Sequence, residues 1–93
     1  MEKYFEFKGV LNMIKTEIKE IVQDIFRDVF DEEELIITEE TNAEDIEDWD
    51  SLAQVRLTVA IEKQFNIKFN FGELTALHNV GEMLNLIDKK LSV

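Results

Sequence analysis

Residues 48–65 read DWDSLAQVRLTVAIEKQF, and in them a long acidic stretch gives way to an apolar segment. Apolar side chains recur in this segment at the spacing of an α-helix, along two ridges: Leu57, Ile61 and Phe65, and Leu52, Val55 and Val59. The sequence therefore predicts a helix over residues 51–65, with Asn66 at its C-terminal end. Because two ridges make a broad apolar arc, we expect this helix to be central and to be contacted on more than one side.

The start of this helix carries Asp50 and Ser51, and either residue is a preferred N-cap. Ser51 is one of two serines in the chain; the other, Ser92, is next to the C-terminal residue. A helix N-terminus exposes unpaired N–H groups and the positive end of the helix dipole. A hydroxyl at this position therefore lies where a negative charge, including a phosphate, is favoured.

Two further helices are predicted on either side of this segment. The first runs from Met13 to about Phe30 and has one wide apolar face. Four acids at residues 31–34 disfavour its continuation, because they crowd the negative end of its dipole. The last helix follows Asn79-Val80-Gly81-Glu82, a variant of the capping box, and its apolar positions are Val80, Met83, Leu84, Ile87 and Leu91.

Two connections separate these helices. In residues 31–50 we expect Leu35, Ile36 and Ile37 to anchor the chain on the core, and a connection of this length is usually functional. Residues 67–78 are expected to form a loop that leads to a short helix near residues 71–77. The predicted fold class is all-α: a small four-helix bundle of three main helices and one short helix, with a long loop between the first and second helices.

The length and composition indicate one small domain. We assign residues 13–93 to it and residues 1–12 to an N-terminal extension. A hydrophobic content of 45% excludes a disordered chain, and the absence of cysteine excludes disulfides, thiolate metal sites and a cysteine nucleophile. No apolar run approaches about 20 residues and the start lacks the pattern of a signal peptide, so we expect a cytoplasmic protein. We also expect a monomer, because the apolar faces can be buried internally.

The formal net charge of −11 is unevenly distributed. Twelve acidic residues and no lysine or arginine lie from Asp28 to Asp50. Such a field repels nucleic acid and anionic membranes, and it steers basic protein partners toward this side of the molecule. We therefore expect neither nucleic-acid binding nor membrane insertion.

The residues do not match the requirements of common catalytic and metal sites. Hydrolysis by Ser51 would need a nearby base and an orienting third group, but the one histidine, His78, lies far along the chain in a predicted loop. The acidic stretch lacks the spacing of a calcium loop: counted from Asp31, position six is Ile36 and position twelve is Asn42. We therefore assign no catalytic residue and no metal site.

Asp50-Ser51-Leu52, preceded by the acidic loop and followed by Val55, Leu57, Ala60-Ile61-Glu62 and Phe65, resembles the phosphopantetheine attachment region of acyl carrier proteins. The resemblance covers about residues 13–91 and includes Asn79-Val80 at the start of the last helix. Asp-Ser-Leu alone is a weak signal. The surrounding helices, the long loop and the chain length make the match specific.

The resemblance implies a carrier and not an enzyme. Ser51 would be esterified by 4′-phosphopantetheine, which a separate phosphopantetheinyl transferase delivers from coenzyme A. Asp50 and Leu52 would be part of the surface that this transferase reads. The terminal thiol of the arm would hold acyl intermediates as thioesters and present them to acyl-loading and acyl-processing enzymes, so the cofactor would supply the thiol that the chain lacks.

The predicted second helix departs from the pattern of the carriers of fatty acid synthesis, which usually display a strongly acidic surface there. Glu62 is the only acid between Leu52 and Phe65. The proline often found shortly after that helix is also absent, with Phe69 in its region. Since charge complementarity governs partner choice, we favour a specialised fatty acid, polyketide, nonribosomal-peptide or saccharide-modification pathway. The residues expected to bind these partners are Gln54, Val55, Arg56 and Val59.

Two alternatives stay open. The chain could be a peptidyl or aminoacyl carrier, because the cargo is chosen by partner enzymes. It could also be a helical protein-interaction module that keeps the bundle without the carrier function, since a fold does not establish a function. Such a module would need no hydroxyl at residue 51.

Overall fold

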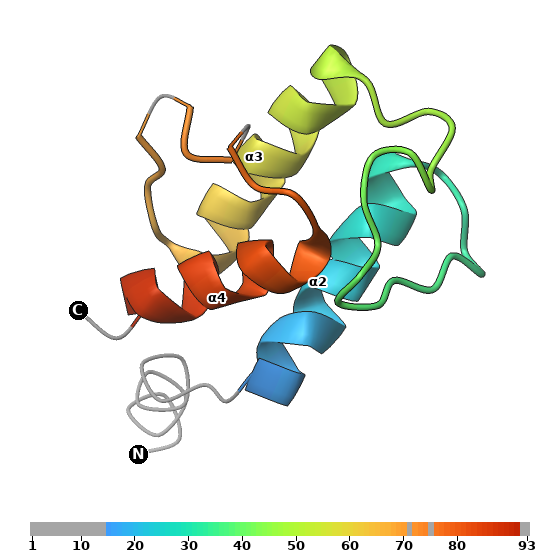
Figure 1. Ribbon diagram of the computed structural model, residues 1–93. Coiled ribbons are helices and arrows are strands. Elements are labelled where there is room, and N and C mark those ends of the chain that lie inside the picture. The colour runs from blue at the N-terminus through green and yellow to red at the C-terminus, as the bar shows by residue number, and fades with distance from the viewer. Residues whose placement is uncertain (1–14, 71, 75, 92–93) are drawn as a thin grey trace.

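The computed structural model describes residues 15–70, 72–74 and 76–91, and in them it contains three α-helices and no strand (Figure 1). The helices are α2 (Lys15–Val29), α3 (Ser51–Phe65) and α4 (Val80–Leu91). The helix predicted over residues 51–65 is confirmed with these bounds, and the fold is all-helical as expected. The predicted N-terminal extension, and Met13 at the expected start of the first helix, lie outside the described residues.

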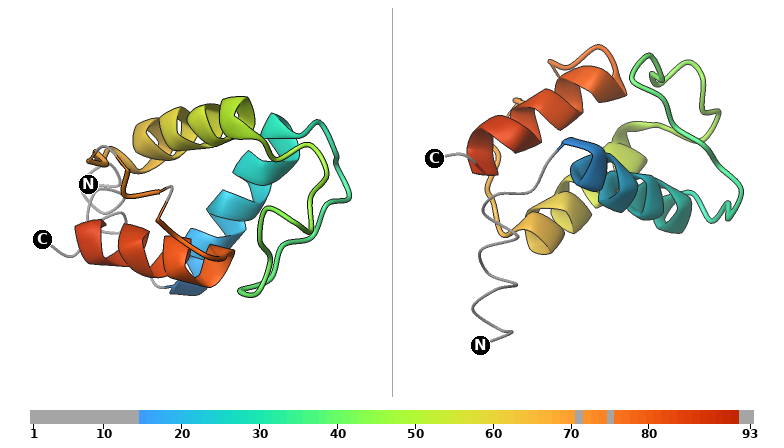
Figure 2. Two further views of the ribbon diagram at one scale, coloured as in Figure 1. Left: turned by 45° about the horizontal axis from the view of Figure 1, so that its top comes forward. Right: turned by 90° about the horizontal axis from the view of Figure 1, so that it is seen from below.

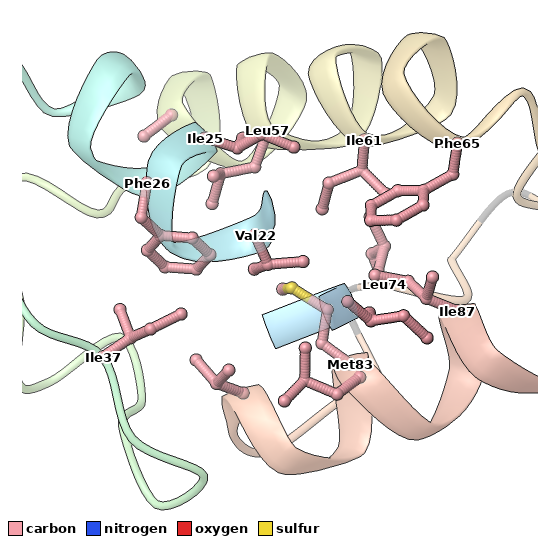
Figure 3. Packing of buried hydrophobic residues seen from close by; sticks show 14 of the residues in the cluster. Val22, Ile25, Phe26, Ile37, Leu57, Ile61, Phe65, Leu74, Met83 and Ile87 are labelled. Atoms are coloured by element: carbon pink, nitrogen blue, oxygen red, sulfur yellow. The ribbon is translucent and has the colours of Figure 1, made fainter. Parts of the chain in front are cut away.

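Helix α2 holds the bundle together, because it packs against both α3 and α4 (Figure 2). Its buried side chains recur at the spacing of one helix face, as the sequence predicted. Figure 3 shows how they meet side chains of the other two helices in a single core. The buried residues of the three helices include Ile18, Val22, Ile25 and Phe26 of α2, Leu57, Ile61 and Phe65 of α3, and Met83, Leu84 and Ile87 of α4.

Helix α3 is buried on one side only, which corrects the expectation of a central helix. Its buried residues are Ala53, Leu57, Ile61 and Phe65. The second ridge predicted to be buried is exposed, with 61% of Leu52, 57% of Val55 and 46% of Val59 accessible. The reason is tertiary: α2 packs on the first ridge, and no described element covers the second.

Helices α2 and α3 are each followed by a residue in the left-handed backbone conformation, Asp31 (φ 54°) and Asn66 (φ 56°). Asp and Asn tolerate this conformation better than most L-residues. After α3 the N–H groups of Asn66 and Ile67 both donate back to the Glu62 carbonyl oxygen, the second over 3.2 Å, which closes the last turn of the helix. The prediction that the helix ends at Asn66 is confirmed.

Residues 30–50 connect α2 to α3, and apolar side chains and hydrogen bonds hold this connection against the core. Ile37 and Ile46 are buried, but Ile36 is 71% exposed, so its predicted role as an anchor is wrong. The carboxamide of Gln23 in α2 holds the backbone around this point: it accepts from the Ile37 N–H over 3.1 Å and donates to the Leu35 carbonyl oxygen. A side chain of α2 thereby supplies partners for backbone groups that no regular structure satisfies.

The start of α4 confirms Asn79 as an N-cap, because its Oδ1 accepts from the Glu82 N–H over 2.9 Å. The second bond of the capping box differs from the pattern. The Glu82 carboxylate accepts from the N–H of His78 over 2.8 Å, and not from that of Asn79. The two hydrogen bonds of this box therefore join residues 78–82, one residue more than the 79–82 that the sequence predicted.

Two backbone hydrogen bonds tie the start of α4 to the connection. The N–H groups of Val80 and Gly81 donate to the carbonyl oxygens of Thr41 and Glu39, each over 2.8 Å. The same segment that leads into α3 is thereby bound to α4 as well.

Between α3 and α4 the described residues form turns. Leu74 is buried and joins this segment to the core, and the Ala76 N–H donates to the Gly72 carbonyl oxygen over 3.1 Å. Residues 71 and 75 lie outside the described residues, so the short helix expected at 71–77 stays a prediction.

Replacing Gly81 by alanine is expected to loosen the junction between the connection and α4. A Cβ at this position would lie 3.0 Å from the Glu39 carbonyl oxygen, which is the acceptor of the Gly81 N–H. We expect Gly81→Ala to lower the free energy of unfolding by about 1 kcal/mol, since a strained or lost hydrogen bond outweighs the helix preference of alanine in a first turn. Urea unfolding measures this change. The matched control is Gln64→Ala on the exposed side of α3, expected to stay within about 0.5 kcal/mol of the parent; an equal loss in both variants would contradict the prediction.

The capping carboxylate should give the stability a measurable pH dependence. The bond from the His78 N–H lowers the pKa of Glu82 below its ordinary value of 4.5. Because the pKa is lower in the folded state, the stabilisation is complete above pH 4.5 and is lost as the pH falls through the folded value. Glu82→Gln, which keeps an acceptor oxygen but cannot titrate, should show a smaller loss of stability on acidification than the parent. An NMR titration of the Glu82 carboxyl carbon with a midpoint at or above the ordinary value would refute this.

Candidate functional site

Ser51 is the first residue of α3, and the residue before it makes the cap. Asp50 has extended backbone angles, and its Oδ1 accepts from the Ala53 N–H over 2.9 Å. The sequence left open whether Asp50 or Ser51 is the N-cap; it is Asp50. The exposed side chain of Ser51 is therefore not required for capping.

The helix start retains a field that favours an anion. The first turn of α3 contains no acidic side chain, and the Asp50 carboxylate occupies only the Ala53 N–H among the donors of this turn. Within the described residues, the backbone N–H groups of Ser51 and Leu52 have no acceptor. A charged oxygen on the Ser51 side chain would lie beside the positive end of the α3 dipole.

Trp49 holds this helix start against α2. Its ring meets the ring of Phe26 edge-on, with centroids 5.2 Å apart, and that of Phe30 at 6.2 Å. Its Nε1 donates to the Gln54 Oε1 over 2.7 Å. This bond was not predicted from the sequence, although indole nitrogens of packed tryptophans usually find an acceptor.

A groove of about 820 Å³ opens beside Ser51. It lies between the start of α3, the turn at residues 42–43, Leu74 with residues 77–79, and the first turn of α4. Its apolar lining includes Val55, Leu74, Leu77 and Met83, and its polar lining includes Asn42, Gln54, His78 and Asn79. A cleft between bundle helices is a common ligand site, but the residues that line this one could not be predicted from the sequence, because its walls come from segments far apart in the chain.

His78 does not form a catalytic pair with Ser51. Its side chain is 85% exposed, and its Nδ1 lies 3.3 Å from the Glu82 carboxylate. His78 lies outside the helices, in the connection before α4, as the sequence predicted. The ring lines the groove that begins at Ser51, which the sequence did not indicate.

The residues expected to bind partners do not all point the same way. Val55, Arg56 and Val59 are exposed on the outward side of α3. Gln54 is partly buried, with its carboxamide turned inward to Trp49. Glu62, the one acid of the helix, is also partly buried and accepts from the Phe69 N–H over 2.9 Å. The outward side of α3 therefore presents apolar and basic side chains.

In the described part of the chain, no group of three or more His, Cys, Asp or Glu side chains is arranged to hold a metal ion. None of the described helices has the length and apolar character to cross a membrane.

Comparison with known proteins identifies this arrangement. Residues 20–87 match the family described as phosphopantetheine attachment site. The chain is 33% identical over 81 residues to an acyl carrier protein of Petrotoga mobilis, a match that spans 87% of this chain and 95% of that protein. It also resembles the solution NMR structure of holo acyl carrier protein from Geobacter metallireducens, with a TM-score of 0.75 and 45% identity over 81% of this chain and 86% of that one.

The family match begins within α2, spans the whole of α3 and ends within α4. The members of this family carry a covalent 4′-phosphopantetheine group and act as carriers rather than as enzymes. The chain belongs to the acyl carrier protein family.

Proposed function

We propose that Ser51 is the residue that carries 4′-phosphopantetheine. One observation carries the proposal: Ser51 is the only serine within residues 20–87, the region matched by the phosphopantetheine attachment family. Its hydroxyl is exposed and is not needed for the cap of α3, because Asp50 makes that bond. Asp50 and Leu52, on either side of it, complete the attachment motif that the transferase would read.

The surroundings of Ser51 fit this group. The start of α3 favours the phosphodiester anion, and the groove beside Ser51 has an apolar lining with few polar atoms. When attached, the group supplies the thiol that holds an acyl chain as a thioester, and this chain has no cysteine of its own.

The partner surface is the outward side of α3, formed by Leu52, Val55, Arg56 and Val59. Three exposed apolar side chains on one helix ridge are unfavourable in water, and such a patch usually marks a surface that another protein covers. Arg56 and Lys63 add positive charge, and the carboxylate of Glu62 is turned toward residue 69. This surface suits partners that present carboxylates around an apolar patch.

A surface of this polarity supports a specialised pathway, of fatty acid, polyketide or related type, over the general fatty acid pathway. Enzymes that dock acidic carriers through basic patches would meet Arg56 and Lys63 here, and like charges placed opposite each other are costly. We assign the carrier domain to residues 13–93, with a short fourth helix near 71–77 and an extension at 1–12, and we infer that the protein works in the cytoplasm as a monomer.

The attachment is tested by the intact mass of the protein before and after incubation with coenzyme A and a broad-specificity phosphopantetheinyl transferase. We expect a gain of one phosphopantetheine, because Ser51 is exposed at the start of α3. Ser51→Ala should abolish the gain. Ser92→Ala, which removes the other serine of the chain, should leave it unchanged.

Circular dichroism of Ser51→Ala separates a failed attachment from a failed fold. Since Ser51 does not cap α3, the variant should keep the helix content of the parent and unfold within about 0.5 kcal/mol of it. No gain of mass by folded parent protein, with a transferase shown to modify another carrier, would favour the alternative of a non-carrier interaction module.

Partner choice is tested with a loading enzyme of general fatty acid synthesis. The parent should be a poor substrate, and Arg56→Glu/Lys63→Glu should lower the KM by about tenfold, because it restores acidic charge to α3. The control Lys68→Glu/Lys89→Glu makes the same change of net charge with exposed residues outside α3 and should have a much smaller effect. Efficient turnover of the parent, unaffected by either pair, would count against a specialised pathway.

A further inference from the structure

The side-chain nitrogen of Gln54 is a buried donor whose orientation is defined. The indole N–H of Trp49 can only donate, so the carboxamide atom it contacts over 2.7 Å is the oxygen of Gln54. The amide nitrogen, Nε2, then points the other way, where it is buried and has no acceptor among the described residues. A buried donor without a partner typically costs more free energy than one hydrogen bond between neutral groups contributes.

The position of this donor connects it with the proposed attachment site. Gln54 lies one helical turn after Ser51 on α3 and lines the groove that begins there. It also lines a second cavity of about 240 Å³, toward Phe69. Three residues line both spaces, Gln54, Val55 and Leu74, and Gln54 is the polar one among them.

A purely structural role does not account for an amide here. A glutamate could accept the same hydrogen bond from Trp49 but would bury a charged oxygen in place of Nε2, and a leucine would remove both polar atoms. What distinguishes glutamine from these residues is the neutral N–H₂ group. A polar group on a residue that lines an apolar ligand groove usually orients a ligand.

We propose that Gln54 Nε2 donates a hydrogen bond to a carbonyl or hydroxyl oxygen of the group that occupies the groove, whether that oxygen belongs to the arm or to its cargo. This inference rests on the proposed attachment at Ser51. It makes Gln54 a residue that positions the carried group, and it implies that the groove holds an oxygen-bearing chain in preference to a plain hydrocarbon.

NMR of protein labelled with ¹⁵N tests this contact without any partner enzyme. The side-chain N–H₂ signals of Gln54 would be compared in the unmodified protein, the phosphopantetheinyl form, the octanoyl form and the 3-oxooctanoyl form, each checked by intact mass. We expect a downfield shift and exchange with solvent slowed by about tenfold when the acceptor is present, which is the effect of one hydrogen bond of ordinary strength.

The forms distinguish the source of the oxygen. A change already seen with the arm alone assigns the acceptor to the arm. One that first appears with octanoyl assigns it to the thioester carbonyl, and one that requires 3-oxooctanoyl assigns it to the cargo. Unchanged shift and exchange in all modified forms would overturn the proposal for Gln54 while leaving attachment at Ser51 intact, whereas the absence of any mass gain would overturn both.

Two variants give an independent readout. Gln54→Glu keeps the acceptor for Trp49 but removes the donor, and Gln54→Leu removes both. In the parent, loading should raise the unfolding midpoint more than it does in either variant, each loaded form being compared with the same protein before loading. Before loading, Gln54→Glu should be less stable than the parent, because its second carboxylate oxygen is buried without a partner. The control Thr58→Val changes a residue of the second cavity whose hydroxyl is already bonded to the Gln54 backbone carbonyl, and it should keep the response to loading. An equal response to loading in the parent and Gln54→Glu would contradict the contact.

Discussion

The contact of the acidic connection with α2 is the constraint on which the other features depend. Residues 30–50 carry most of the negative charge of the chain, and such a segment would move away from the protein unless apolar burial opposed the repulsion. Ile37, Ile46 and the Trp49–Phe26 ring contact supply that burial, and Gln23 satisfies the backbone between them. The charged side chains can then face solvent while the backbone of the connection is held in one conformation. The contacts of the connection therefore position the start of α3, as do those of the helix itself.

Three successive residues at that start have separate tasks. Trp49 packs on the core, Asp50 caps the helix, and Ser51 does neither. Modifying a residue that packs on the core or caps the helix would lower the stability. Ser51 has neither role, so its side chain can be modified without that loss. The same reasoning separates Gln54 from its exposed neighbours, because only part of its carboxamide has a structural partner.

The sequence was sufficient to predict the helices but not their surroundings. Period and capping residues depend on local chemistry, which is why residues 51–65, Asn66 and the Asn79 cap were predicted correctly. The two ridges of α3 have nearly the same composition and spacing, so only the position of α2 decides that Leu57 is buried and Val55 exposed. Ile36 and Ile37 are adjacent and identical, and the connection turns one outward and the other inward. The groove depends on Leu74, residues 77–79 and α4, and no local pattern in the sequence predicts that they approach Ser51.

The inward turn of Glu62 has a consequence for partner encounter. With that carboxylate bonded to the Phe69 N–H, negative charge is concentrated in the connection, and the outward side of α3 keeps Arg56 and Lys63 beside its apolar ridge. Long-range attraction acts mainly on the rate of encounter, whereas contacts within the interface act mainly on the rate of dissociation. In the proposed docking mode a basic region of a partner would first be drawn to the connection, and carboxylates around an apolar patch would then be selected on α3. A partner with only the basic region would associate fast but also dissociate fast. A partner with only the carboxylates and the apolar patch would dissociate slowly but associate slowly. High affinity therefore requires both features, and this requirement makes binding selective.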